Sequence, residues 1–143
     1  MKKINLLYTS ILFLSITLFS VKETQAQCDT IATICNQNFT KEYLSDGQEY
    51  RALLINEQTA EFHLTLYGGS IYRFGACSGM NSGNLVFRVY DQDYNEIFSN
   101  SEHELSPYWD FKVNSTLDVI VEANLNQDKV NSGCAVLLVG FKP

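Results

Sequence analysis

From residue 50 onward, apolar and polar side chains alternate with a period of two, which is the pattern of half-buried β-strands. Phe62, Leu64 and Leu66 alternate with polar residues in one segment, and Phe87 and Val89 are placed in the same way in another. Glycine, asparagine, aspartate and serine residues separate such segments and favour turns. The pattern predicts eight strands, over residues 50–55, 60–67, 71–77, 85–90, 96–99, 108–113, 117–123 and 134–141.

Short strands at near-regular spacing favour an all-β fold, because no connection between them is clearly long enough to hold a crossover helix. We therefore predict a jelly-roll-like β-sandwich of two packed sheets, in which the third and eighth strands are antiparallel neighbours. The same alternation places four aromatic residues on the inward faces, where they should form part of the core: Phe62, Phe87, Trp109 and Phe111.

The first 26 residues have the composition of a secretory signal peptide. Two lysines precede an apolar run over residues 4–21, and the small residue Ala26 marks a cleavage position. A retained membrane anchor is the alternative, because the run approaches the ~20 residues that span a bilayer. A lipid anchor is disfavoured, since Gln27 rather than a small residue precedes Cys28. The prediction is a protein that is secreted or periplasmic.

The exported chain is predicted to comprise an N-terminal hook or short helix over residues 27–46 and a β-sandwich domain over residues 47–143. In the first segment a three-four-four spacing would place four apolar residues on one helical face: Cys28, Ile31, Cys35 and Phe39. A helix would hold Cys28 and Cys35 roughly 10 Å apart, beyond disulfide reach. The segment is therefore either an irregular hook, the preferred interpretation, or a helix whose cysteines attach it to the sheet.

All four cysteines follow the predicted cleavage position, and in a small exported domain they predict two disulfides with three possible pairings. Cys77 ends the third predicted strand and Cys134 begins the eighth, so antiparallel neighbours would bring both to one end of a sheet. We expect Cys77 to pair with Cys134, and Cys28 with Cys35. Zinc is the alternative, although the chain has no C-x-x-C pair.

Charge narrows the range of partners. Removal of Lys2, Lys3, Lys22 and Glu23 with the signal changes the formal net charge from −6 to −8. An acidic chain argues against nucleic acid or an anionic membrane surface as partner, because both require clustered lysine and arginine. We expect no cofactor.

One segment carries the spacing of most of a calcium-binding loop. Counted from Asp91, oxygen-bearing side chains stand at positions 1, 3, 5, 9 and 12, which include Asp93, Asn95 and Glu102. Position 6, a glycine in such loops, is Glu96. We therefore predict a hairpin in which aspartate and asparagine bond their own backbone, with a calcium site as the alternative.

Aromatic residues on strands could form a stacking platform for sugar rings, through Tyr72, Tyr90, Tyr94, Tyr108 and Trp109. Aromatic residues are also common in strands for packing reasons alone. Catalysis is not predicted. His63 and His103 have no nucleophile motif beside them, and Ser78 is a loop serine outside any G-x-S-x-G elbow.

Four stretches between residues 47 and 141 also carry a family resemblance: Y-R-A-L-L, A-E-F-H-L-T-L-Y-G-G-S-I-Y-R-F, N-L-V-F-R-V-Y-D-Q-D-Y-N-E-I-F and D-V-I-V-E-A. They resemble bacterial pre-peptidase C-terminal domains, β-sandwich modules with a strand that ends in an Asp-rich hairpin. The closing S-G-C-A-V-L-L is similar to small exported proteins of Gram-negative bacteria. The resemblance implies a β-sandwich. Such modules normally follow a catalytic domain, whereas this one follows a predicted signal peptide.

These observations favour an exported, non-catalytic β-sandwich module for binding or adhesion, whose ligand is a carbohydrate or a protein. One alternative is a structural or protein-interaction domain of the cell envelope without a small-molecule site, and another is a calcium-binding module. A binding module should expose an aromatic patch or a groove, whereas an enzyme should show a deep pocket with convergent titratable groups.

Overall fold

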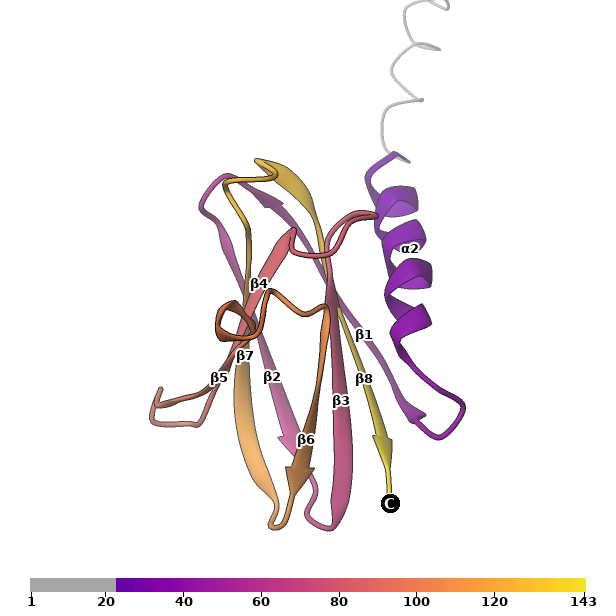
Figure 1. The fold of residues 1–143 in the computed structure, drawn as a ribbon, viewed down its shortest axis with the longest axis vertical. Coiled ribbons are helices and arrows are strands. Elements are labelled where there is room, and N and C mark those ends of the chain that lie inside the picture. Colours follow the sequence, from indigo (N-terminus) through magenta and orange to yellow (C-terminus); the bar gives the residue numbers. More distant parts are fainter. Residues whose placement is uncertain (1–22) are drawn as a thin grey trace, which may run out of the picture.

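Two four-stranded antiparallel sheets pack face to face in the computed structural model of the chain (Figure 1). The structure describes residues 23–143, so the predicted signal peptide lies outside the described residues except for its last four positions. No helix among the described residues is long and apolar enough to cross a membrane. The strands are β1 (Leu44–Ile55), β2 (Thr59–Leu66), β3 (Ser70–Cys77), β4 (Leu85–Tyr90), β5 (Glu96–Ser99), β6 (Tyr108–Val113), β7 (Leu117–Leu125) and β8 (Ser132–Lys142).

Strand order confirms the predicted eight-stranded, jelly-roll-like β-sandwich. The first sheet, sheet A, has the order β1-β8-β3-β6, and the second, sheet B, has the order β2-β7-β4-β5. β3 and β8 are antiparallel neighbours, as expected, with Phe74 opposite Val139. β1 begins at Leu44, ahead of the predicted start of the sandwich domain at residue 47.

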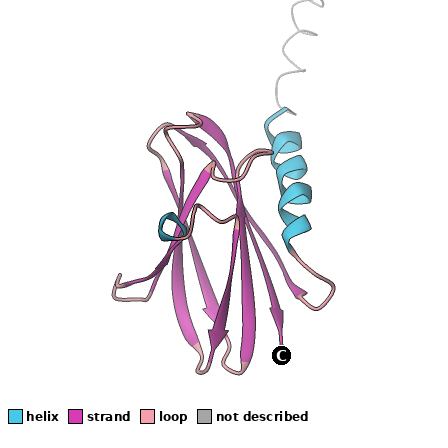
Figure 2. Ribbon diagram, in the orientation of Figure 1, coloured by secondary structure: helices cyan, strands magenta, loops and turns pink. Residues whose placement is uncertain are grey.

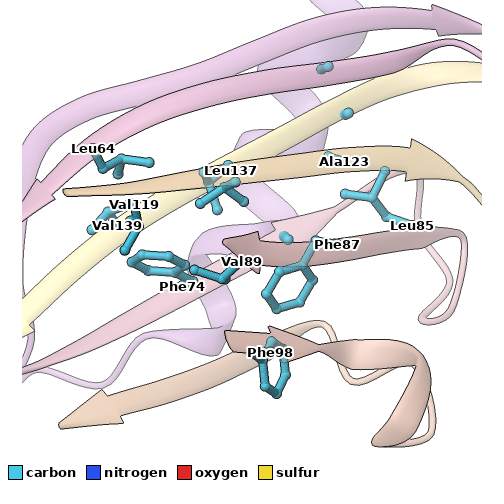
Figure 3. Packing of buried hydrophobic residues seen from close by; sticks show 14 of the residues in the cluster. Leu64, Phe74, Leu85, Phe87, Val89, Phe98, Val119, Ala123, Leu137 and Val139 are labelled. Carbon is cyan, nitrogen blue, oxygen red and sulfur yellow. The ribbon is translucent and has the colours of Figure 1, made fainter. Parts of the chain in front are cut away.

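Side chains from the inner faces of both sheets meet in one core (Figure 3). Phe74 of sheet A and Phe87 of sheet B are completely buried, and the ring of Phe87 lies 5.4 Å from that of Phe98. The other three aromatic residues predicted for the core pack against it while staying partly accessible: Phe62, Trp109 and Phe111. The period of two therefore assigned these four positions to the inward faces correctly.

A helix covers the outer face of sheet A. Figures 1 and 2 show α2 (Glu23–Cys35) lying against this sheet alone, followed by the 3-10 turn η1 (Asn36–Asn38). Ile31 and Ala32 of the helix are buried against Val136 and Leu138 of β8. This face forms a second, smaller core, so the interpretation of the segment as an irregular hook is wrong.

Two disulfides attach the helix, and their pairing differs from the prediction. Cys28 bonds Cys134 and Cys35 bonds Cys77, with Cα–Cα distances of 5.4 and 5.7 Å. Cys77 lies opposite Val136, which makes Cys134 its diagonal neighbour, at about 7–8 Å and beyond disulfide reach. Cys28 and Cys35, two helical turns apart, can each reach one member of this diagonal pair. All four thiols are used, and two disulfides indicate an oxidising, extracytoplasmic compartment.

The chain after the helix stays on the same face. The ring of Phe39 lies over Gly75 and Gly140, where any β-carbon would come within 2.7 and 2.9 Å of it. Further along, the Arg73 guanidinium lies 4.5 Å from the rings of both Tyr43 and Tyr108. The cover of sheet A therefore extends from the helix to β6.

We predict that the two disulfides stabilise the fold to similar extents. The chain-entropy relation assigns about 5 kcal/mol to the Cys28–Cys134 bridge and about 4 kcal/mol to Cys35–Cys77, because they span 106 and 42 positions. Cys28→Ser and Cys35→Ser should each lower the melting temperature strongly. Peptide mapping without reduction checks the pairing directly, and a fragment joining Cys77 to Cys134 would contradict it.

Phe87 should be among the most sensitive core positions. Phe87→Ala is expected to lower the free energy of unfolding by about 3 to 5 kcal/mol, because it removes a completely buried ring. Urea denaturation of the parent and the variant measures this loss. Val86→Ala, on the outward side of the same strand, is the control and should cost less. A loss below ~1 kcal/mol for Phe87→Ala would contradict the packing.

Candidate functional site

The two sheets differ in what covers their outer faces. Helix α2 lies on sheet A, whereas no described element packs as a layer on sheet B (Figure 1). We call the outer surface of sheet B, together with the hairpin between β4 and β5, the open face. Its side chains come from alternate positions of β2, β7 and β4 and from the hairpin: Glu61, His63, Thr65, Asp118, Ile120, Glu122, Arg88, Tyr90, Gln92 and Tyr94.

Two glutamates and two tyrosines meet at the centre of the open face. Glu61 of β2 lies directly opposite Glu122 of β7. The Tyr94 hydroxyl donates to Oε2 of Glu61 at 3.3 Å, and the rings of Tyr90 and Tyr94 lie 6.1 Å apart. Burial, and then the charge of Glu122, raise the pKa of Tyr90, while the charge of Glu61 raises that of Tyr94. Both phenols therefore remain protonated donors.

Negative charge dominates this surface. Glutamates placed directly opposite one another in a sheet repel. Arg88 lies opposite Glu122 on the other side, but its Nε is also 3.8 Å from a carboxylate oxygen of Glu96. Besides Glu61, Asp118 and Glu122, the hairpin and the start of β5 add Asp91, Asp93 and Glu96 to the carboxylates around Arg88. The face is therefore suited to meeting positive charge.

A hollow of about 510 Å³ lies beside this cluster. Ile120 lines it together with His63, Thr65, Gln92 and Asp118. Both oxygens of Asp118 accept hydrogen bonds, from the Thr65 hydroxyl at 2.5 Å and from Gln92 at 2.8 Å. Nε2 of His63 lies 2.6 Å from a carboxylate oxygen of Glu61. These titratable groups are thus engaged with neighbouring side chains on a surface.

The segment considered for calcium forms the hairpin between β4 and β5. Oδ1 of Asp91 accepts from the backbone N–H groups of Asp93 and Asn95, and Oδ2 accepts from the Asn95 side chain, each at 2.9 Å. These hydrogen bonds, that of the Asn95 side chain first, lower the pKa of Asp91. Glu102 lies in the 3-10 turn η2 (Asn100–Glu102) beyond β5. Among the described residues, no three histidine, cysteine, aspartate or glutamate side chains form a group suited to a metal ion.

The tyrosines considered for a platform lie in three places. Tyr90 and Tyr94 share the open face. Tyr108 lies on the outer side of sheet A beside Arg73. Tyr72 is only 6% exposed, because β3 turns it toward the core together with Phe74. The four rings therefore do not form one outward platform. Trp109 is partly buried, with its ring 4.2 Å from that of His103.

The open face contains functional candidates that sequence reasoning missed, above all Glu61 and Glu122. They are 61 positions apart in the chain, and only the pairing of β2 with β7 makes them neighbours. Their alternate positions in two outward strand faces were visible in the sequence, but nothing in the sequence fixed the register between those strands. His63, considered only for catalysis, lies in the same group.

The fold and this surface define a two-sheet β-sandwich with one covered and one open face. No protein-family model matches the chain, and no curated protein matches it. Among solved structures, the fold is similar to the crystal structure of Aeromonas hydrophila PliG, a periplasmic lysozyme inhibitor of g-type lysozyme. The identity is 13%, the TM-score is 0.52, and the match covers 73% of this chain and 91% of that chain. Such a likeness shows a shared fold.

Calcium should leave the stability of the protein unchanged, because neighbouring donors occupy both oxygens of Asp91. Thermal melts with and without millimolar calcium test this expectation. Asp91→Ala should lower the melting temperature in either buffer. Since folding lowers the pKa of Asp91, this effect should be present above about pH 4 and fade as the pH falls through the folded-state pKa. A melting temperature that rises on addition of calcium, with a rise that Asp93→Ala abolishes, would instead establish a calcium site.

Proposed function

We propose that this protein is an exported, non-catalytic β-sandwich module that binds a protein partner through the open face of sheet B. The observation that carries the proposal is that only one of the two sheets has its outer face covered. A disulfide-bonded helix occupies one outer face, and the other presents tyrosines and carboxylates without a covering layer. The similar fold of PliG, an inhibitor that acts on another protein, supports the same function.

The chemistry of the open face favours a basic partner. A lysine or arginine from the partner would relieve the repulsion between Glu61 and Glu122. Tyr90 and Tyr94 supply the amphipathic rings that are enriched at protein interfaces, and Tyr94 is 56% exposed. The hollow over Ile120 offers an apolar surface for the aliphatic part of such a side chain. Complementary charge would also speed association.

A g-type lysozyme is the first partner to test, because the structurally similar PliG inhibits that enzyme class. Binding is measured by surface plasmon resonance with the lysozyme immobilised, at low and at physiological salt. The affinity of the parent should fall as salt rises, since the proposed contacts are charged. Absence of saturable binding at both salt concentrations would contradict this choice of partner.

Two double variants with equal net charge distinguish the contribution of the open face to binding from an effect of net charge alone. Glu61→Gln/Glu122→Gln should weaken binding by about tenfold or more, mainly through slower association and faster dissociation of the central contact. Glu57→Gln/Glu104→Gln removes the same charge from exposed positions off the open face, and it should change affinity less than about twofold. Equal losses in the two variants would show that only net charge matters.

A further inference from the structure

A second concave site opens where the edges of the two sheets meet. β1 is an edge strand of sheet A and β2 is an edge strand of sheet B. Between them lies a cleft of about 580 Å³, within the ~300 to 1,000 Å³ that is typical of ligand pockets. Its lining combines aromatic, aliphatic and polar side chains: Asp46, Gln48, Tyr50, Tyr67, Ser70, Tyr72 and Phe141 among them.

A bulge in β1 shapes the mouth of the cleft. The pairing of β1 with β8 shifts register between Ser45 and Glu49. Gly47, at the centre of this bulge, has φ of 81°, a conformation that glycine adopts without strain. The bulge takes Asp46 and Gln48 out of the regular ladder, and both side chains line the cleft.

Aromatic rings form the walls. The ring of Tyr50 lies 5.5 Å from that of Phe62, and the ring of Tyr72 lies 5.9 Å from that of Phe141. The Tyr72 hydroxyl accepts a hydrogen bond from the backbone N–H of Tyr67 at 3.0 Å, which fixes its ring. Tyr67 itself is 65% exposed at the rim. Tyr67, Tyr50 and Phe141 keep accessible ring surface for a ligand, whereas Tyr72 is only 6% exposed and Phe62 packs behind Tyr50 without lining the cleft.

The polar groups of the cleft are acceptors and neutral donors. Asp46 accepts from the backbone N–H of Gln48 at 2.8 Å, and Oε1 of Gln48 accepts from the Tyr50 hydroxyl at 2.6 Å. The Ser70 hydroxyl is both a donor and an acceptor. No lysine or arginine lines the cleft among the residues that the structure describes there. His63 does line it, with Nε2 held 2.6 Å from a carboxylate oxygen of Glu61. Burial raises the pKa of Asp46. In its ionised form this carboxylate would repel an anionic ligand.

We propose that this cleft binds one ring of a neutral saccharide. The apolar face of the ring stacks on the tyrosines, and its hydroxyl groups donate to Asp46 and exchange hydrogen bonds with Gln48 and Ser70. The uncharged ring matches a lining without lysine or arginine, and its alternating apolar faces and hydroxyl edges match tyrosine walls beside polar side chains. The cleft adjoins the open face, because His63, Leu64 and Thr65 line both it and the hollow. Its tyrosines and its bulge lie outside the open face, so the two proposals can be tested separately.

The test is a titration of the exported protein, isotope-labelled and with both disulfides formed, followed by amide shifts in NMR spectra. The probes are the neutral disaccharides cellobiose, maltose and N,N′-diacetylchitobiose, with glucuronate and tetramethylammonium as charged controls. At least one disaccharide should give saturable shifts centred on residues 46–50 and 67–72. Tyr67→Ala should weaken its affinity by about tenfold or more, and Asp46→Asn should weaken it as well.

Tyr94→Ala is the matched control, because it removes an exposed tyrosine from the open face instead. It should leave saccharide affinity unchanged, and Tyr67→Ala should leave binding to the g-type lysozyme unchanged, so the two proposals fail separately. The saccharide site is overturned if none of the disaccharides saturates. It is equally overturned if a charged control binds more tightly, or if Tyr94→Ala weakens saccharide binding as much as Tyr67→Ala does.

Discussion

Burial of β8 on both faces is the constraint on which the rest of the structure depends. Its inward residues Leu137 and Val139 belong to the core between the sheets, and its outward residues Val136 and Leu138 are buried beneath the helix. A strand that is apolar on both sides must be covered on both sides, and burial stabilises by about 25 cal/mol per Å² of apolar surface. The helix therefore completes the sandwich, and two disulfides hold it in place.

The segment that covers sheet A also approaches the sheet backbone closely. Phe39 reaches the backbone of β3 and β8 because Gly75 and Gly140 have no side chains there. Beyond it, Arg73 is held between two tyrosine rings and donates to both oxygens of Asp110, at 2.6 and 2.8 Å. These hydrogen bonds lower the pKa of Asp110. The polar groups on this face thus satisfy one another within the protein.

With the outer face of sheet A covered by the helix, the outer face of sheet B and the sheet edges are the surfaces on which we propose recognition. The open face keeps a like-charged glutamate pair at its centre, an arrangement that internal packing does not require and that costs stability. Surfaces used for binding commonly retain such local conflicts, because a partner resolves them. The cleft beside β1 differs in character, since aromatic walls and neutral polar groups dominate it. One small domain therefore presents two surfaces of unlike chemistry.

The sequence determined the strands, because alternation is local. β4 and β5 occupy the predicted residues, whereas β1 begins at Leu44, ahead of the predicted residue 50. The three-four spacing of Cys28, Ile31 and Cys35 also indicated the helical face, although disulfide reach favoured a hook. Phe39 lies beyond the helix in extended conformation. Only the tertiary structure decided how the cysteines pair and that Glu61 meets Glu122. The glutamate pair depends on the register of β2 against β7. The cysteine pairing depends on the register of β3 against β8 and on which face of β8 receives the helix. A strand that is apolar on both faces carries no alternation that could reveal that face.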